Sequence, residues 1–110
     1  MKTQPQITFH NIDTSPKLSA LVEEKIAKLE HLSDRITACR VTLSRAQGSG
    51  HKNRPFEVGI ELDLPGNVIV VNHKHDKHAD HDNPHVAIRD SFNAAQRQLR
   101  HHLRKVSDVH

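Results

Sequence analysis

Residues 56–71, FEVGIELDLPGNVIVV, contain the pattern that decides the fold. From Phe56 to Leu64 every second residue is apolar, and each residue between them is polar or glycine. This alternation is typical of a β-strand with one buried face. The letters PGN at 65–67 predict a tight turn, and VIVVN at 68–72 predicts a returning strand. The sequence therefore predicts an antiparallel hairpin whose apolar face needs a covering layer.

The residues before the hairpin predict a strand, a helix and a second strand. QITFHNI at 6–12 and ITACRVTLS at 36–44 alternate in the manner of strands. Between them, apolar residues recur at helical spacing and form one stripe. Ser15 is expected to cap this helix, and Pro16 suits its first position. A helix between two strands allows them to pair in parallel through a right-handed crossover.

After the hairpin, the chain predicts a long final helix. Pro84 opens it, Asn83 is the expected cap, and the helical pattern runs to about Lys105. The predicted order is therefore β-α-β-β-β-α. It corresponds to an α+β two-layer sandwich with a four-stranded sheet and two helices on its apolar face. With 110 residues, the chain is expected to form one domain, with a core spanning about 6–105.

Composition excludes several classes of protein. No apolar run approaches the roughly 20 residues of a membrane span, and the first residues, MKTQPQITFH, lack the apolar stretch of a secretory signal. A cytoplasmic protein is expected.

The single cysteine, Cys39, excludes an internal disulfide. It lies in the apolar phase of a strand, which predicts a buried, unreactive thiol. We find no phosphate-cradling glycine loop and no catalytic motif, so the prediction is a non-enzymatic protein without a cofactor.

The final helix carries the clearest functional pattern. Successive residues lie about 100° apart around a helix axis, which gathers two sets of side chains into separate wedges. The apolar wedge, expected to be buried, contains Ile88, Phe92, Ala95, Leu99 and Leu103. A second wedge, roughly 120° away, contains four arginines. These arginines are Arg89, Arg97, Arg100 and Arg104.

Two interpretations of the arginine wedge are open. Arginines keep many protein surfaces soluble, which requires no partner. However, residues 83–106 hold five Lys/Arg and a single acid, Asp90, while the rest of the chain has a net charge of −1. Such localised positive charge favours a polyanion, because arginine can bind phosphate bidentately and releases counterions when it does so. The chain has no Trp or Tyr, so phosphate contact is favoured over base stacking.

Residues 72–83 are predicted to form a histidine-rich loop, and residues 73–85 contain five histidines and three aspartates. Three interpretations are open. The loop could hold a metal ion through histidines, for which the candidates are His73, His75, His78 and His81. It could be a solvated polar loop without a ligand. It could also contact RNA, with Lys74 and Lys77 binding phosphates and the histidines adding positive charge in acid.

The order of four segments resembles a known family. ITFHNIDTSPKLSALVEEKIAKLE, the CRVTL strand, FEVGIELDLPGNVIVV and AIRDSFNAAQRQLRHHLRK together resemble the ribosome hibernation-promoting factor family, also called the ribosome-associated inhibitor or sigma-54 modulation family. The resemblance covers about residues 6–105. KIAKLE and the final helix are moderately specific by themselves, whereas the order of all four segments is much more specific.

The resemblance implies a fold similar to double-stranded-RNA-binding domains and a non-catalytic role. Members bind the small ribosomal subunit in the channel that holds mRNA and the tRNA anticodon stems, and they inhibit translation reversibly under stress. Basic helix residues face ribosomal RNA. By position, the resemblance assigns this role to Lys25, Lys28, Arg97 and Arg100.

The sequence also departs from the family pattern. Members commonly begin the last helix with Asp-x-Tyr-x-Ala-Ile, whereas this chain has NPHVAI, with His85 at the place of the tyrosine. The loop before this helix is unusually long and rich in histidine. The chain stops soon after the helix, as short members do, whereas long members continue into a dimerisation domain. The resemblance therefore implies the short type.

Overall fold

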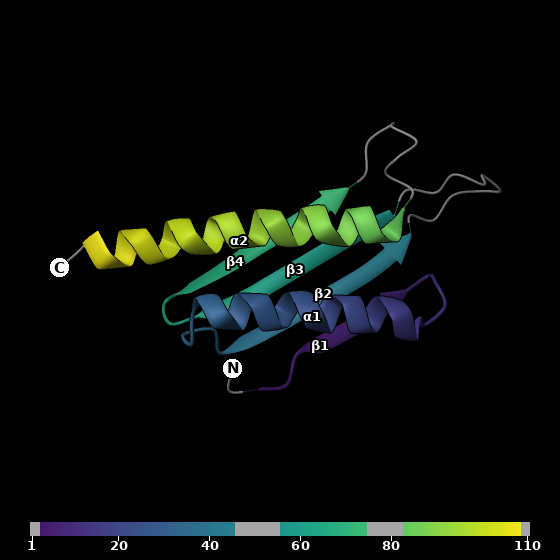
Figure 1. Cartoon of the computed structure of the whole chain (residues 1–110), viewed down its shortest axis with the longest axis horizontal. Coiled ribbons are helices and arrows are strands. Elements are labelled where there is room, and N and C mark those ends of the chain that lie inside the picture. Colours follow the sequence, from purple (N-terminus) through teal and green to yellow (C-terminus); the bar gives the residue numbers. More distant parts are fainter. Residues whose placement is uncertain (1–2, 46–55, 75–82, 109–110) are drawn as a thin grey trace.

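The computed structural model describes residues 3–45, 56–74 and 83–108, with 73–74 and 106–108 described by their backbone only. The elements follow the predicted order (Figure 1). They are β1 (Gln6–His10), α1 (Pro16–Leu32), β2 (Ala38–Arg45), β3 (Phe56–Leu64), β4 (Asn67–Lys74) and α2 (Pro84–Asp108). The α+β prediction is confirmed.

The four strands form one mixed sheet in the order β1-β2-β3-β4. β1 pairs with β2 in parallel, and the other two pairings are antiparallel, as the sequence predicts. The predicted start of the histidine-rich loop is wrong. β4 continues to Lys74, so residues 72–74 of the predicted loop 72–83 belong to the strand. The reason is its register: Asn72, His73 and Lys74 pair with consecutive residues of β3.

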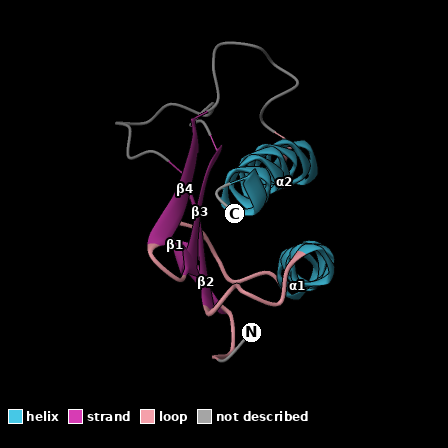
Figure 2. Ribbon diagram, turned by 90° about the vertical axis from the view of Figure 1, so that its left-hand side faces the viewer, coloured by secondary structure: helices cyan, strands magenta, loops and turns pink. Residues whose placement is uncertain are grey.

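Both helices cover one face of the sheet and leave the other face open, as Figure 2 shows with the sheet seen edge-on. Along β3, burial alternates at every position, which puts its apolar residues under the helices. These residues are Phe56, Val58, Ile60, Leu62 and Leu64. Each such side chain contributes roughly 1.5–3 kcal/mol of hydrophobic stabilisation when fully buried. The alternation in β3 therefore decides which face of the sheet receives the helices.

Helix caps form where the sequence predicts them. The Ser15 hydroxyl accepts a hydrogen bond from the backbone N–H of Leu18 at 3.3 Å. The side-chain oxygen of Asn83 accepts one from the backbone N–H of His85 at 3.0 Å. Each bond satisfies a donor that has no partner within its own helix.

The apolar wedge of α2 packs on the sheet. Its first four members are buried and Leu103 is partly buried. The sequence did not predict that Ala87 and Ser91 are also fully buried. They widen the buried face of the first half of α2, where small side chains allow close packing. Figure 1 shows the C-terminal turns of α2 extending beyond the strand ends, so this part of the helix is less covered.

The turn between β3 and β4 requires glycine. Leu64 and Asn67 are paired, so only Pro65 and Gly66 form the loop. Gly66 has φ 76°, which is the left-handed region. Proline followed by a residue with positive φ is the pattern of a type II turn, in which side chains other than glycine are strained.

We expect Gly66→Ala to lower the free energy of unfolding by about 1 kcal/mol, because alanine is strained at positive φ. Urea denaturation followed by circular dichroism measures this. Gly59→Ala is the control, since an added Cβ would lie 3.4 Å from Asn72 Oδ1, an ordinary contact. It should leave stability unchanged or raise it by about 0.5 kcal/mol. Equal losses in both variants would contradict the assigned turn.

The Cys39 thiol is 1% exposed, and burial raises its pKa to about 11. A disulfide reagent at pH 8 should therefore label the native protein at least about 100-fold more slowly than the urea-unfolded chain. Moving the thiol to an exposed position of α1 in the double variant Cys39→Ala/Ala20→Cys should abolish this protection. The raised pKa also makes the free energy of unfolding depend on pH. The stabilisation from burying the neutral thiol is complete below the pKa of the thiol in the unfolded chain, and it is lost as the pH rises towards 11. Rapid labelling of native Cys39 would contradict this packing.

Candidate nucleic-acid interface

Three of the four predicted arginines lie free on the outer surface of α2. Arg97, Arg100 and Arg104 are exposed, and within the segments that the structure describes none of them forms an ion pair. They lie on the side of α2 away from the sheet because Leu99 and its apolar neighbours occupy the opposite side. Their guanidinium groups are thus available to an anion from outside the domain.

Arg89 differs from the other three. Its Nη2 lies 3.2 Å from Asp90 Oδ1, and its Nε donates to the same oxygen at 3.2 Å. The side chains of Arg89 and Asp90 are 57% and 34% exposed, so this contact is a surface ion pair of small energy. It still places a carboxylate beside the arginine. Arg89 is consequently less available to an anion from outside the domain than the other three arginines.

The other predicted basic residues are placed unequally. α1 lies beside α2 on the same face of the sheet (Figure 2). On α1, Lys28 is exposed, whereas Lys25 is half-buried at the edge of the apolar stripe. Lys74 is the last residue of β4, where its backbone pairs with Glu57. Lys77 lies outside the described residues.

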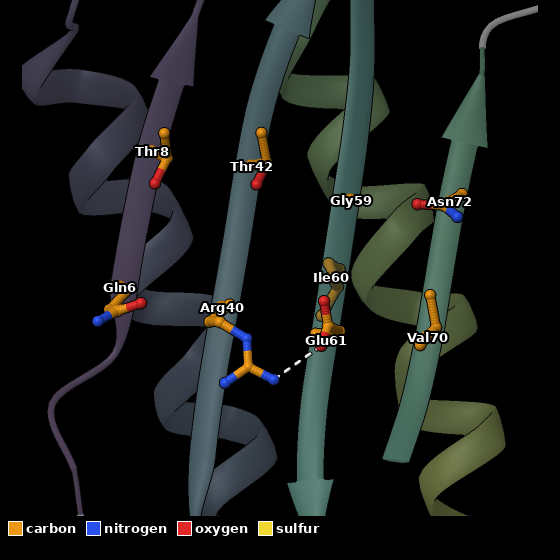
Figure 3. Close-up of a pocket in the computed structure, with 9 residues that line it drawn as sticks. All are labelled: Gln6, Thr8, Arg40, Thr42, Gly59, Ile60, Glu61, Val70 and Asn72. Atoms are coloured by element: carbon orange, nitrogen blue, oxygen red, sulfur yellow. Dashed lines mark hydrogen bonds and ion pairs between the residues drawn. The ribbon is translucent and has the colours of Figure 1, made fainter.

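The open face of the sheet has a different electrostatic character. A depression of about 150 Å³ lies on this face. Figure 3 shows the side chains that line it, with Arg40 extended toward Glu61. Arg40 Nη2 lies 2.7 Å from Glu61 Oε1 and 2.8 Å from Asp63 Oδ1, and its Nη1 donates to Asp63 Oδ2 at 3.2 Å. The hydrogen bonds to Asp63 are the largest cause of a raised Arg40 pKa, and the bond to Glu61 is the next. Two carboxylates therefore neutralise this guanidinium, which makes the face unsuitable for phosphate.

A second hollow, of about 330 Å³, lies between the C-terminal half of α2 and the β3–β4 turn. We call it the α2 groove. Its lining residues are Asn67, Arg97, Gln98, His101, His102 and Lys105. Sequence reasoning selected only Arg97 among them. The available signal was the run QRQLRHHLRK at 96–105, which contains no acid.

The metal hypothesis gains no support from the described segments. Within them, no group of three or more His, Cys, Asp or Glu side chains is arranged to hold an ion. Of the predicted candidates, His75, His78 and His81 lie outside the described residues, and His73 is described by its backbone only.

Within the described residues, neither helix combines the length and apolar character that crossing a membrane requires.

Comparisons with known proteins agree with the fold. A family model described as Sigma 54 modulation protein / S30EA ribosomal protein matches residues 6–107. The chain is 30% identical over 95 residues to a ribosome hibernation promotion factor of Deinococcus radiodurans. That alignment covers 86% of this chain and 46% of the relative, so the chain spans about half the length of that protein.

Two solved structures share the architecture. A ribosomal subunit interface protein from Coxiella burnetii superposes with a TM-score of 0.72 at 19% identity, and the N-terminal domain of Thermus thermophilus Protein Y with 0.65 at 21%. Each alignment covers 89% of this chain and 94% of the other. At these identities the superpositions support the fold.

Proposed function

The chain belongs to the Sigma 54 modulation protein / S30EA ribosomal protein family, and from this premise we propose that it binds the small ribosomal subunit and promotes ribosome hibernation. In this proposal the protein occupies the decoding channel, contacts ribosomal RNA and inhibits translation during stress without catalysing a reaction. It would act in the cytoplasm, where ribosomes work. The name of the Deinococcus radiodurans relative supports hibernation as the process.

The observation that carries the proposal is the arginine surface of α2, formed by Arg97, Arg100 and Arg104, which have no ion pair within the described segments. Arg97 and Arg100 are three positions apart, and Arg100 and Arg104 are four positions apart, so the three groups extend over a rise of about 10 Å along the helix. Neighbouring guanidinium groups repel one another, and a phosphate backbone relieves this repulsion. Arg40, by contrast, is already neutralised on the open face of the sheet. The helical face is therefore the side that suits RNA.

The absence of surface aromatic residues supports contact with the RNA backbone. The chain lacks Trp and Tyr, and its three phenylalanines belong to the core. Phe56 and Phe92 are buried, and Phe9 is partly buried and packs against the core. Modules that read single-stranded bases need exposed aromatic rings for stacking. Folded RNA recognised through phosphates and shape, of which ribosomal RNA is an example, suits this surface better.

Arg97→Glu/Arg100→Glu should weaken binding to purified small subunits about 100-fold or more, because two phosphate ligands become repulsive charges. The control is Lys17→Glu/Arg35→Glu, which changes the net charge equally at exposed positions outside α2. It should bind within about threefold of the parent, because it changes only the long-range electrostatic attraction to RNA, which salt screens. Sedimentation with small subunits measures both, and circular dichroism checks that each variant folds.

Equal weakening by both double variants would show that only net charge matters and would contradict a defined α2 surface. Competition tests the finer parts of the proposal. Excess mRNA and tRNA bound in the decoding channel should displace the protein, whereas unrelated duplex RNA should not. Displacement by duplex RNA alone would instead indicate a general RNA-binding domain.

A further inference from the structure

β4 is an edge strand: β3 pairs with one side of it and, in the segments that the structure describes, no strand pairs with the other. Leu64 and Asn67 close a two-residue loop, and in such a hairpin this pair is hydrogen-bonded. Bonded and non-bonded pairs alternate along the strand, so Val68, Val70 and Asn72 direct their backbone groups away from β3. The Val68 N–H fits this pattern, since it donates to Asn67 Oδ1. Figure 3 shows Val70 and Asn72 on this outermost strand.

The outer edge of β4 lacks the features that usually protect an edge strand. Such strands are commonly short, bulged, or interrupted by proline or charged residues, which prevents other chains from pairing with them. Residues 67–72 contain no proline and no charge, and the register with β3 continues without a bulge from Asn67 to Lys74. Val68 and Val70 are each 50% exposed, and they are the exposed large hydrophobic residues of the described part of the chain. The edge therefore offers backbone hydrogen bonds and β-branched side chains to an incoming strand.

The α2 groove, defined above, lies next to this edge. Asn67, the first residue of β4, lines the groove, and its Nδ2 lies 3.1 Å from His102 Nδ1 on α2. α2 packs on both β3 and β4, and Figure 1 shows its C-terminal turns projecting past β4. A strand added to β4 would lie below these turns. Because successive side chains of a strand point to opposite faces, half of them would face α2 and half would join Val68 and Val70 on the open face of the sheet.

The lining of the α2 groove defines which side chains of an added strand it can receive. Arg97 and Lys105 are exposed cations, and none of the lining side chains in the described part of the chain is a carboxylate. Neither cation forms an ion pair within residues 3–45, 56–74 and 83–108. Carboxylates on the added strand would supply the complementary charge. On the open face, by contrast, Val68 and Val70 favour apolar neighbours.

A second copy of this chain does not match the edge. Pairing β4 with β4 of another copy about a two-fold axis would bring the two α2 helices side by side. Their facing sides would then carry Arg97 and Lys105 from both copies, and these like charges repel. The residues of β4 that face α2, Ile69 and Val71, are buried and apolar, so they supply no carboxylate. The matching partner is an acidic segment of a different protein.

We propose that the outer edge of β4 and the α2 groove together form a docking site for an extended acidic segment of a partner protein, which adds to the sheet as a fifth strand. Its β-branched side chains pack beside Val68 and Val70, and its alternate Asp or Glu side chains bind Arg97 and Lys105. One consequence rests on the proposed function. Because Arg97 also belongs to the arginine surface, the bound segment keeps RNA from that surface and opposes ribosome binding.

The probe is a synthetic peptide, blocked at both ends and as long as the eight residues of β4, in which valine and glutamate alternate. Fluorescence anisotropy should show saturable binding to the parent, and the same peptide with lysine in place of glutamate should bind at least about tenfold more weakly. Val70→Pro removes one outward N–H without a change of charge, at an edge position where proline is tolerated, and should weaken binding about tenfold. Val70→Thr keeps the N–H and the β-branched shape and should bind within about threefold of the parent. Circular dichroism checks that each variant folds.

Lys105→Glu tests the charge of the groove. It should remove the preference for the glutamate peptide over the lysine peptide, because it places a carboxylate where the glutamates bind. Lys17→Glu makes the same charge change at an exposed position of α1 and should keep the preference.

Amide hydrogen exchange locates the added strand. The N–H groups of Val70 and Asn72 should exchange at least about tenfold more slowly when the glutamate peptide is bound, because they acquire hydrogen bonds. Those of Ile69 and Val71, which bond to β3 in the alternating pattern, should change much less. Protection of Thr8 on β1, the opposite edge of the sheet, in place of Val70 and Asn72 would overturn the assigned edge.

No saturable binding of the glutamate peptide, or equal binding of both peptides, would overturn the docking site. A dimer of the parent that Val70→Pro abolishes in analytical ultracentrifugation would overturn the choice of partner. Competition tests the link to the proposed function, since saturating glutamate peptide should weaken binding to small subunits at least about fivefold. Peptide binding without this competition would overturn the exclusion of RNA. Failure of the protein to bind small subunits without peptide would overturn the proposed function and leave the docking site in place.

Discussion

The packing of the apolar stripe of α2 on the sheet is the constraint on which the rest of the structure depends. β3 alternates so strictly that only one face of the sheet can receive helices. α2 must then turn Ile88, Phe92, Ala95 and Leu99 toward that face. Burying them releases several kcal/mol of hydrophobic free energy, which exceeds the cost of holding exposed arginines near one another. The orientation of the arginine surface thus follows from the core.

The two faces of the domain have opposite electrostatic roles as a result. On the open face of the sheet, cross-strand neighbours place carboxylates opposite Arg40 and neutralise it. On the helical face, α2 supplies four arginines, of which Arg89 is the one that forms an ion pair within the residues that the structure describes. An approaching polyanion would encounter attraction on one side and little on the other. Electrostatic orientation of this kind favours a defined docking geometry.

Local periodicity was sufficient to predict the fold and the arginine surface, because both depend on which residues share a face of one element. The β3–β4 turn and both helix caps were likewise predictable from PGN, Ser15 and Asn83. The α2 groove was not, because it requires a turn at Asn67 to lie beside a helix residue 35 positions later. Burial of Ala87 and Ser91 also depends on how closely α2 approaches the sheet, which spacing alone does not define. The predicted roles of Lys77 and of the histidines at 75–81 concern residues outside the described segments.

The central claim is that unpaired arginines of α2 hold the protein on ribosomal RNA through backbone phosphates. The salt dependence of binding to purified small subunits measures this most directly, since each phosphate contact contributes about 0.7–0.9 to the slope of log Kd against log salt concentration. With three unpaired arginines engaged, the account predicts a slope of roughly 2 or more between about 50 and 300 mM salt. A slope near zero with binding still tight would contradict it.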